Sequence, residues 1–397
     1  MCNPAGAVAE RDMLEVQDIF LIYGDEYRKN HKLPANVLQA MSAIEKCRTQ
    51  ALGGHADVCG DCGHVRVSYN SCRNRHCPKC QTLARERWVD GQKNNLLNVR
   101  YFHVVLTIPD TLNTIAFQNQ DVVYNILFKA ASETLSELCH DRKYLGADIG
   151  FTAVLHTWGQ NLMHHPHLHC IVPGGGIDET GKWINSRKKF FIPVKVLSRK
   201  FRGKFLYFLK KAFLNEKLNF FGEQSYLQDK NRFNDFLSKH YEKEWVVYCK
   251  PPFKDASCVV EYLGRYTHRV AISNSRILSI DNGRVRFKWR DYKDNSKWKV
   301  MDLSADEFIR RFLIHILPSG FMKIRHYGLL GNRNRKTKIL ICKQLTNTAI
   351  LLHDRLSTDA LIMKVIGIDI NRCPYCGSIN IFRRNLSKAP PCTLKIS

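Results

Sequence analysis

Two histidines separated by one residue, His167 and His169, are the side chains of this sequence best suited to hold a catalytic metal ion. They lie in a segment that predicts a β-strand, where alternate side chains point to the same face. Two imidazoles on one face, with Leu168 on the other, need water or a ligand, because burying them unpaired is costly. Neutral imidazoles leave a divalent cation its full charge and open positions, which suits the polarisation of a phosphate oxygen.

A third metal ligand is expected from the preceding strand, and two residues qualify. His156 lies eleven residues before His167, and an antiparallel turn near residues 160–164 would bring it diagonally opposite the histidine pair. Gln160 is the alternative, because its side-chain carbonyl oxygen can also bind a metal. The sequence leaves this choice open.

Two tyrosines further along the chain, Tyr262 and Tyr266, are one turn apart on a predicted helix that Asp255 can cap. Such a pair is commonly only a packed aromatic stripe. Here Arg265 and Arg269 lie beside it, and both are suited to bind DNA phosphates. A tyrosine hydroxyl can attack a phosphodiester when a metal or base favours its ionisation. The product is a phosphotyrosine, which conserves the bond energy for later rejoining.

Six of the fifteen cysteines fall between residues 47 and 80. In a reducing compartment so many thiols indicate metal ligands rather than disulfides. Two CxxC motifs, Cys59–Cys62 and Cys77–Cys80, are separated by fourteen residues, a spacing close to that of zinc ribbons. They predict one tetrahedral, structural zinc site. Four potential ligands of this stretch remain: Cys47, His55, Cys72 and His76. They predict a second zinc site, unless the two histidines are surface residues.

A further CxxC motif, Cys373–Cys376, lies near the C-terminus. It is half of a zinc site, and its partners would be Cys342, Cys392 or a histidine.

The charge balance indicates a polyanionic partner. Lys and Arg number 61 against 36 Asp and Glu, a formal net charge of +25, so nucleic acid is the first candidate and a membrane surface the second. Cations surround the zinc motifs, which favours contact with DNA. These cations are Arg73, Arg75, Lys79, Arg85 and Arg87.

Two further basic stretches each allow two interpretations. Residues 182–211 interleave cations with aromatic side chains, which either stack unpaired bases or belong to the core. Residues 323–338 would clamp a DNA backbone or form a basic linker.

The composition, 44% hydrophobic and 11% aromatic, excludes a disordered tail, a collagen-like chain and a coiled-coil rod. No apolar run approaches the length of a membrane span, and the charged N-terminus lacks the apolar core of a signal peptide. We therefore expect a soluble, cytoplasmic protein.

The residue pattern around these side chains predicts an α+β fold. Its antiparallel strands are expected at residues 101–108, 151–158 and 166–172. Four segments are expected along the chain. They are a helical and zinc-binding DNA-recognition domain (1–97), a catalytic domain (98–275), its C-terminal part (276–340) and a tail with the last CxxC motif (341–397).

The order of these motifs resembles the two-tyrosine HUH transposases of the insertion sequence 91 family. The histidine motif at residues 167–169 is followed by the YxxxY pair, and residues 69–81 resemble that family's zinc-binding domain. The segments 156–176, 262–277 and 325–330 also fit. The resemblance covers roughly residues 40–335 and leaves the tail after residue 340 unmatched.

This resemblance implies a fold and an activity. The fold would be the HUH endonuclease palm, an antiparallel sheet with flanking helices, joined to a small N-terminal zinc-binding domain. Its metal, Mg²⁺ or Mn²⁺, would sit on His167 and His169 with His156 or Gln160. In rolling-circle transposition, one tyrosine nicks single-stranded DNA at the element's end and joins the 5′ phosphate. The second tyrosine acts on the other end or on the target DNA.

Other functions remain open at this stage. A plasmid replication initiator or conjugative relaxase uses the same chemistry, and a non-catalytic zinc-dependent DNA-binding protein would need only the cysteines. A zinc hydrolase would lack an evident carboxylate base beside the histidine pair. Since no GxxxxGK[ST] phosphate loop is present, unwinding would depend on a host helicase, the replication machinery or DNA supercoiling.

Overall fold

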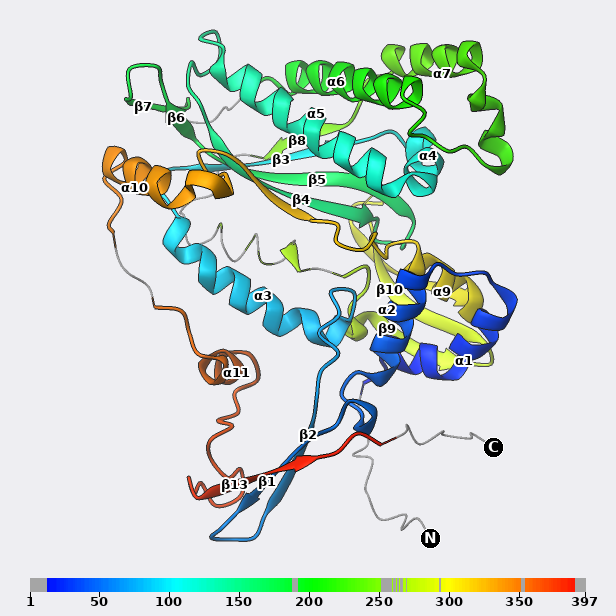
Figure 1. Cartoon of the computed structure of the whole chain (residues 1–397), viewed down its shortest axis with the longest axis vertical. Coiled ribbons are helices and arrows are strands. Elements are labelled where there is room, and N and C mark those ends of the chain that lie inside the picture. Colours follow the sequence, from blue (N-terminus) through cyan, green and yellow to red (C-terminus); the bar gives the residue numbers. More distant parts are fainter. Residues whose placement is uncertain are drawn as a thin grey trace.

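The computed structural model describes residues 13–187, 192–250, 270–292, 294–350 and 354–389, together with residues 259, 262, 264, 267 and 268. Helices and antiparallel strands alternate through the chain, which confirms the predicted α+β class (Figure 1). Short 3-10 turns connect several elements, at Gln50–Leu52, Lys93–Asn95, Asp110–Leu112, Gly222–Gln228, Asn274–Arg276 and Asn332–Asn334.

A five-stranded antiparallel sheet forms the centre of the molecule, in the order β12-β4-β5-β3-β8. Its strands are β3 (Tyr101–Thr107), β4 (Gly150–Trp158), β5 (His164–Pro173), β8 (Val247–Lys250) and β12 (Ile324–Gly328). The predicted hairpin is confirmed, because β4 and β5 pair along most of their length. A short pair beside the sheet consists of β6 (Gly175–Ile177) and β7 (Trp183–Asn185).

Helices cover one face of this sheet (Figure 1). They are α4 (Asn113–Gln118), α5 (Gln120–His140), α6 (Val194–Leu214) and α7 (Lys230–Glu242). The inward side chains of the strands, among them Leu155 and Leu168, are fully buried against these helices. Phe201 and Phe205 of α6 lie in the same core, so the core interpretation of the aromatic residues in this basic stretch holds for both.

A second core joins the N-terminal helices to the segment between β8 and β12. Helices α1 (Val16–Asn30) and α2 (Ala35–Lys46) pack with α9 (Ala305–Leu313), and the Phe20 and Phe312 rings meet edge to face at 5.3 Å. A three-stranded sheet completes this core. Its strands are β9 (Ile277–Asp281), β10 (Arg284–Asp291) and β11 (Lys297–Ser304).

A third, small sheet is built from both ends of the chain (Figure 1). The hairpin of β1 (Gly54–Cys59) and β2 (Val65–Tyr69) is extended by β13 (Ile381–Leu386), which pairs with β1. Helix α3 (Pro78–Gln92) leads from this region toward the central sheet, while α10 (Arg335–Leu345) and α11 (Thr358–Ile366) carry the chain back. Among the described residues, no helix has the length and apolar character needed to cross a bilayer.

Candidate active site and zinc sites

Three histidines converge on the face of the central sheet opposite helices α5 and α6. His156 on β4 lies directly opposite His167 on β5, and His169 is two residues further along β5. The Nε2 atoms of His167 and His169 are 3.1 Å apart, and one ring nitrogen from each of the three residues lies within 4.8 Å of the others. His156 is thus directly opposite His167 and diagonally opposite His169.

The backbone fixes the orientation of His167. Its Nδ1 is 2.6 Å from the carbonyl oxygen of His165, a contact in which Nδ1–H donates. The lone pair of Nε2 is then directed toward the other two imidazoles. A backbone carbonyl on the outer ring nitrogen is the usual way in which proteins orient a metal-binding histidine.

The alternative ligand, Gln160, has a different partner in the structure. The Gln160 amide donates a hydrogen bond to the Tyr292 hydroxyl at 3.3 Å. The two histidines of the same turn also have other partners. His164 Nε2 contacts the Tyr124 hydroxyl, while His165 Nδ1 lies 3.3 Å from Asp110.

A fourth histidine, His103, joins the cluster to the tyrosine segment. Its Nε2 lies 2.8 Å from Nδ1 of His169, and its Nδ1 lies 3.0 Å from the hydroxyl of Tyr262. The side chain is 2% exposed, and burial together with the nearby Lys250 lowers the pKa of His103 to about 3, so the ring is neutral. His103 was not predicted from the sequence. The available signal was its place on the predicted strand 101–108, on the face opposite Phe102 and Val104, but strand register is not readable from one sequence.

The described residues of the tyrosine segment pack against helix α3. Tyr262 packs in a small cluster with Trp88 of α3 and Ile171 of β5. A Cβ at Gly264 would come within 2.4 Å of Val89 Cγ2, so only glycine allows this close approach. The other predicted residues of this segment lie outside the described residues: Tyr266, Arg265, Arg269 and the capping Asp255.

Four cysteines form a cluster between helices α2 and α3. Cys47 ends α2, Cys72 follows β2, and Cys77 and Cys80 begin α3. The Sγ distances are 3.5 Å for Cys47–Cys80 and 3.6 Å for both Cys72–Cys80 and Cys47–Cys77. A tetrahedral zinc ion with Zn–S bonds of about 2.3 Å holds its sulfurs about 3.8 Å apart. The cluster has the spacing of a zinc site.

The structure groups the cysteines differently from the prediction. Cys77 and Cys80 lie with Cys47 and Cys72, whereas the motif Cys59–Cys62 lies with Cys373–Cys376. The physical reason is the β1–β2 hairpin, whose turn carries Cys59 and Cys62 to the end remote from α3. Spacing alone does not reveal that a hairpin separates the two motifs.

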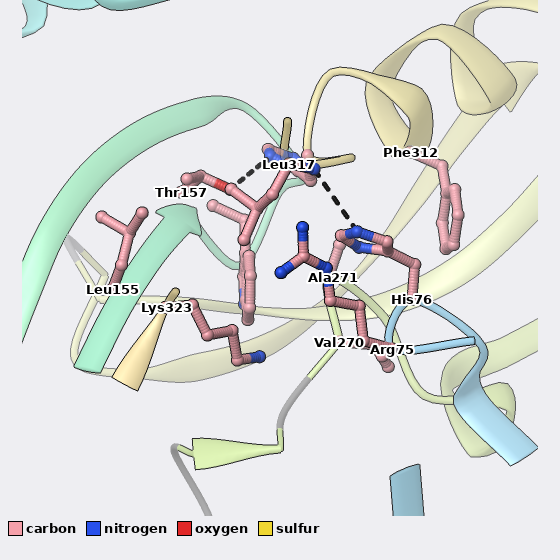
Figure 2. A pocket seen from close by; sticks show the side chains of 11 residues that line it. Arg75, His76, Leu155, Thr157, Val270, Ala271, Phe312, Leu317 and Lys323 are labelled. Carbon is pink, nitrogen blue, oxygen red and sulfur yellow. Dashed lines mark hydrogen bonds between the residues drawn. The ribbon is translucent and has the colours of Figure 1, made fainter. Parts of the chain in front are cut away.

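The two predicted histidine ligands of the zinc sites lie outside both cysteine clusters. His76 accepts a hydrogen bond from the Leu317 backbone N–H at 3.3 Å and lines a small cavity with His315 and Lys323 (Figure 2). Burial lowers the pKa of His76 to about 3, so it stays neutral. His55 is 3.7 Å from Asp57 instead.

Two of the predicted DNA contacts are engaged inside the protein. Arg75 donates to the carbonyl oxygens of Phe321 and Pro318, and Figure 2 shows its side chain beside the small cavity. Lys79 bonds Glu15 and Gln17, at 2.7 and 2.6 Å. Both side chains anchor the zinc region to its neighbours, because burial favours paired cations over free ones. Arg73 is exposed and retains the predicted role as a hypothesis.

The predicted partners of the C-terminal motif also differ from those in the structure. Cys342 is 1% exposed in an apolar cluster with Leu97 and Leu329, and it lies outside the cysteine clusters. Cys392 lies outside the described residues.

Two family models match the chain, one over the N-terminal cysteine-rich region and one over the region with the histidine cluster. The family model described as a putative transposase matches residues 150–338, and that of a transposase zinc-binding domain matches residues 19–108. The Cys47 cluster lies within the second range, so the cysteine geometry and this match agree on structural zinc.

Two curated relatives are transposases by description. The putative transposase y4qJ of Sinorhizobium fredii (strain NBRC 101917 / NGR234) is 50% identical over 368 residues, 91% of this chain and 92% of the relative. The transposase for insertion sequence element IS801 of Pseudomonas savastanoi pv. phaseolicola is 28% identical over 302 residues, 75% of this chain and 70% of the relative. No solved structure matches. The chain therefore belongs to the insertion sequence 91 family of transposases, enzymes that act on DNA.

Proposed function

We propose that this transposase nicks and rejoins single-stranded DNA at the ends of its element through 5′-phosphotyrosine intermediates, in rolling-circle transposition. The observation that carries the proposal is the convergence of His156, His167 and His169 on one face of the central sheet. The hydroxyl of Tyr262 reaches the same face, one histidine away from the cluster.

The donor set fits a catalytic divalent cation. His156, His167 and His169 would hold it, and three protein ligands leave positions for phosphate oxygens, unlike a closed structural site. The cation, Mg²⁺ or Mn²⁺, would supply charge stabilisation on the scissile phosphate.

The hydrogen bonds around His103 give Tyr262 a defined environment. If His169 turns Nε2 toward a cation, its Nδ1 carries the proton and donates to Nε2 of His103. His103 then carries its own proton on Nδ1 and donates to the Tyr262 oxygen. A hydrogen bond received by that oxygen stabilises the phenolate over the phenol, which favours attack. His103 thus acts as a positioning residue that links the metal ligand to the nucleophile.

The covalent step exchanges one phosphate ester for another. The Tyr262 hydroxyl loses its proton to solvent water and its oxygen attacks phosphorus, and the bond from phosphorus to the 3′ oxygen breaks. The leaving oxygen takes a proton back from solvent and becomes a free 3′ hydroxyl, while the 5′ phosphate stays on tyrosine. We assign the second strand-transfer reaction, at the other element end or the target DNA, to Tyr266. Unwinding of the donor DNA would come from host proteins or supercoiling.

A covalent-trapping assay tests this proposal. The purified full-length protein is incubated with single-stranded oligonucleotides from the element's ends, labelled on either side of the nick, with Mg²⁺ or Mn²⁺. We expect a denaturation-resistant adduct that carries only the label 3′ of the nick. It should disappear in His167→Ala and in the double variant Tyr262→Phe/Tyr266→Phe. An adduct that survives the double tyrosine variant, or none from a folded protein that binds these ends, would refute it.

A further inference from the structure

The two CxxC motifs that the small sheet brings together have the same backbone geometry. Gly63 follows Cys62, and Gly377 follows Cys376, both with left-handed φ angles of 71° and 76°. Each glycine N–H donates to the carbonyl of the first cysteine of its motif, at 3.0 Å for Gly63 to Cys59 and 2.9 Å for the C-terminal pair. A left-handed turn at the residue after the second cysteine suits glycine, which has no Cβ.

The four sulfurs face one another at metal-binding distance. Cys59 Sγ is 3.6 Å from Cys376 Sγ, and Cys62 Sγ is 3.6 Å from Cys373 Sγ. All four sulfurs lie within 4.8 Å of each other, close to the spacing of about 3.8 Å in a tetrahedral tetrathiolate site. Four thiolates complete the coordination of zinc and leave no open position, so such a site is structural.

We propose that Cys59, Cys62, Cys373 and Cys376 bind a second zinc ion, distinct from the one at Cys47, which clasps the C-terminal segment to the β1–β2 hairpin. Neither matched family range contains this donor set, because the zinc-binding range ends at residue 108 and the transposase range at residue 338. The ligands of the clasp are up to 317 residues apart along the chain.

Contacts beyond the cysteines show what the clasp would hold in place. Strand β13 pairs with β1 over six positions, from Gly54 opposite Leu386 to Cys59 opposite Ile381. The buried carboxylate of Asp57 on β1 lies 2.7 Å from Arg383 on β13, and Asn380 donates to Asp61 at 2.8 Å. The C-terminal segment therefore completes the sheet and covers the outer edge of β1.

The chain that leads to the clasp also touches helix α3. Lys364 of α11 forms an ion pair with Glu86 at 2.9 Å, and the Leu356 N–H donates to Asp90 at 2.9 Å. Helix α3 begins at the first zinc cluster and carries Val89, which contacts the tyrosine segment at Gly264. A zinc clasp on the C-terminal segment thus holds the strap of residues 354–389 against the helix that supports the nucleophile.

Metal analysis of the full-length protein tests the clasp. We expect two zinc ions per chain by elemental analysis and native mass spectrometry. Cys373→Ser/Cys376→Ser should retain one, while the matched control Cys249→Ser, a cysteine outside both clusters, should retain two. The double variant should also release its C-terminal segment early in limited proteolysis. One zinc ion in the wild-type protein, iron in place of zinc, or two zinc ions in the double variant would overturn the proposal.

A second measurement does not depend on the folding of a variant. The wild-type protein reconstituted with ¹¹³Cd should give two cadmium resonances in the tetrathiolate range, apart from any nitrogen-shifted resonance of the histidine cluster. A single resonance in the tetrathiolate range would overturn the assignment. Neither measurement depends on DNA cleavage, so the clasp can fail while the proposed function stands, and the reverse.

Discussion

The histidine cluster on the central sheet and the two cysteine clusters have their ligand atoms at similar distances from one another but differ in the number and type of those atoms. Three imidazoles converge on a face that also carries a tyrosine, and in the proposed function their number would leave coordination positions for a substrate. Each cysteine cluster has four sulfur donors, which would fill the tetrahedral coordination of a zinc ion and leave no open position. Ligand number and ligand type therefore distinguish the proposed catalytic site from the structural zinc sites.

The two kinds of cluster also differ in how far their ligands are apart in the sequence. The three histidines come from neighbouring strands of one hairpin, within residues 156–169. The Cys47 cluster spans a whole hairpin, and the second cysteine cluster joins the two ends of the chain. Loss of a histidine should therefore affect chemistry, whereas loss of a cysteine should affect how segments are held together.

The largest effect is expected from His167→Ala. Removing one of three ligands weakens the charge stabilisation of the phosphate, worth several kcal/mol, so DNA cleavage should fall by about a thousandfold. Zinc content and thermal stability should stay close to wild type. Cleavage kinetics on single-stranded DNA check the loss of activity, and metal analysis of the same sample checks the unchanged zinc content. Near wild-type cleavage by the variant would break the distinction between the clusters.

Cys47→Ser should give the converse result. It removes a ligand that joins α2 to α3, so the first zinc should be lost and the free energy of unfolding should fall by several kcal/mol. Denaturant unfolding and zinc analysis measure this, with Cys249→Ser as the control. An unchanged zinc content would show that Cys47 is not a ligand.

The positioning role of His103 is tested by His103→Ala. Removing the outer partner of a metal-binding histidine typically costs about 10–100-fold in metal affinity or activity, and we expect both to fall. His103→Gln should restore much of the loss, because its amide can accept from His169 and donate to Tyr262. Cleavage rates as a function of Mn²⁺ concentration and pH provide the readout. A merely structural role predicts no shift in either profile.

A smaller effect is expected from Gly264→Ala. The added Cβ would meet Val89 Cγ2 at 2.4 Å, and overpacking of this kind costs about 1–3 kcal/mol. Cleavage should fall because the tyrosine segment must move off α3. The double variant Gly264→Ala/Val89→Ala should recover activity, since it removes the clash. If the double variant is no better than the single one, contact with α3 does not position the tyrosine.

The smallest effect concerns a buried histidine away from the clusters, His315. It accepts a hydrogen bond from Thr157, donates to the Leu162 carbonyl, and burial lowers its pKa to about 3. Below the unfolded-state pKa of about 6.5, this histidine gains a proton in the unfolded chain but not in the native state. The free energy of unfolding therefore decreases as the pH falls. Between pH 7.5 and 5.5, wild type should lose about 1.4 kcal/mol more than His315→Gln in denaturant unfolding. Equal losses would contradict a neutral His315.

Much of the catalytic region was predictable because its signals are local. Alternation along residues 166–172 fixes the shared face of His167 and His169, and the nearby turn brings His156 opposite His167. His103 escaped prediction because its place beside His169 depends on the pairing of β3 with β5. The cysteine grouping escaped because strand β13, near the end of the chain, pairs with β1. Non-local strand pairing is the information that a single sequence does not display.

The most direct test of the account is to identify the residue that carries the DNA. Wild-type protein is trapped on a single-stranded element end, digested with protease and nuclease, and the nucleotide-bearing peptide is sequenced by mass spectrometry. We expect a 5′-phosphate ester on Tyr262 or Tyr266, formed only with a divalent metal and absent in His167→Ala. An ester on any other residue, or one that forms equally well without metal, would contradict it.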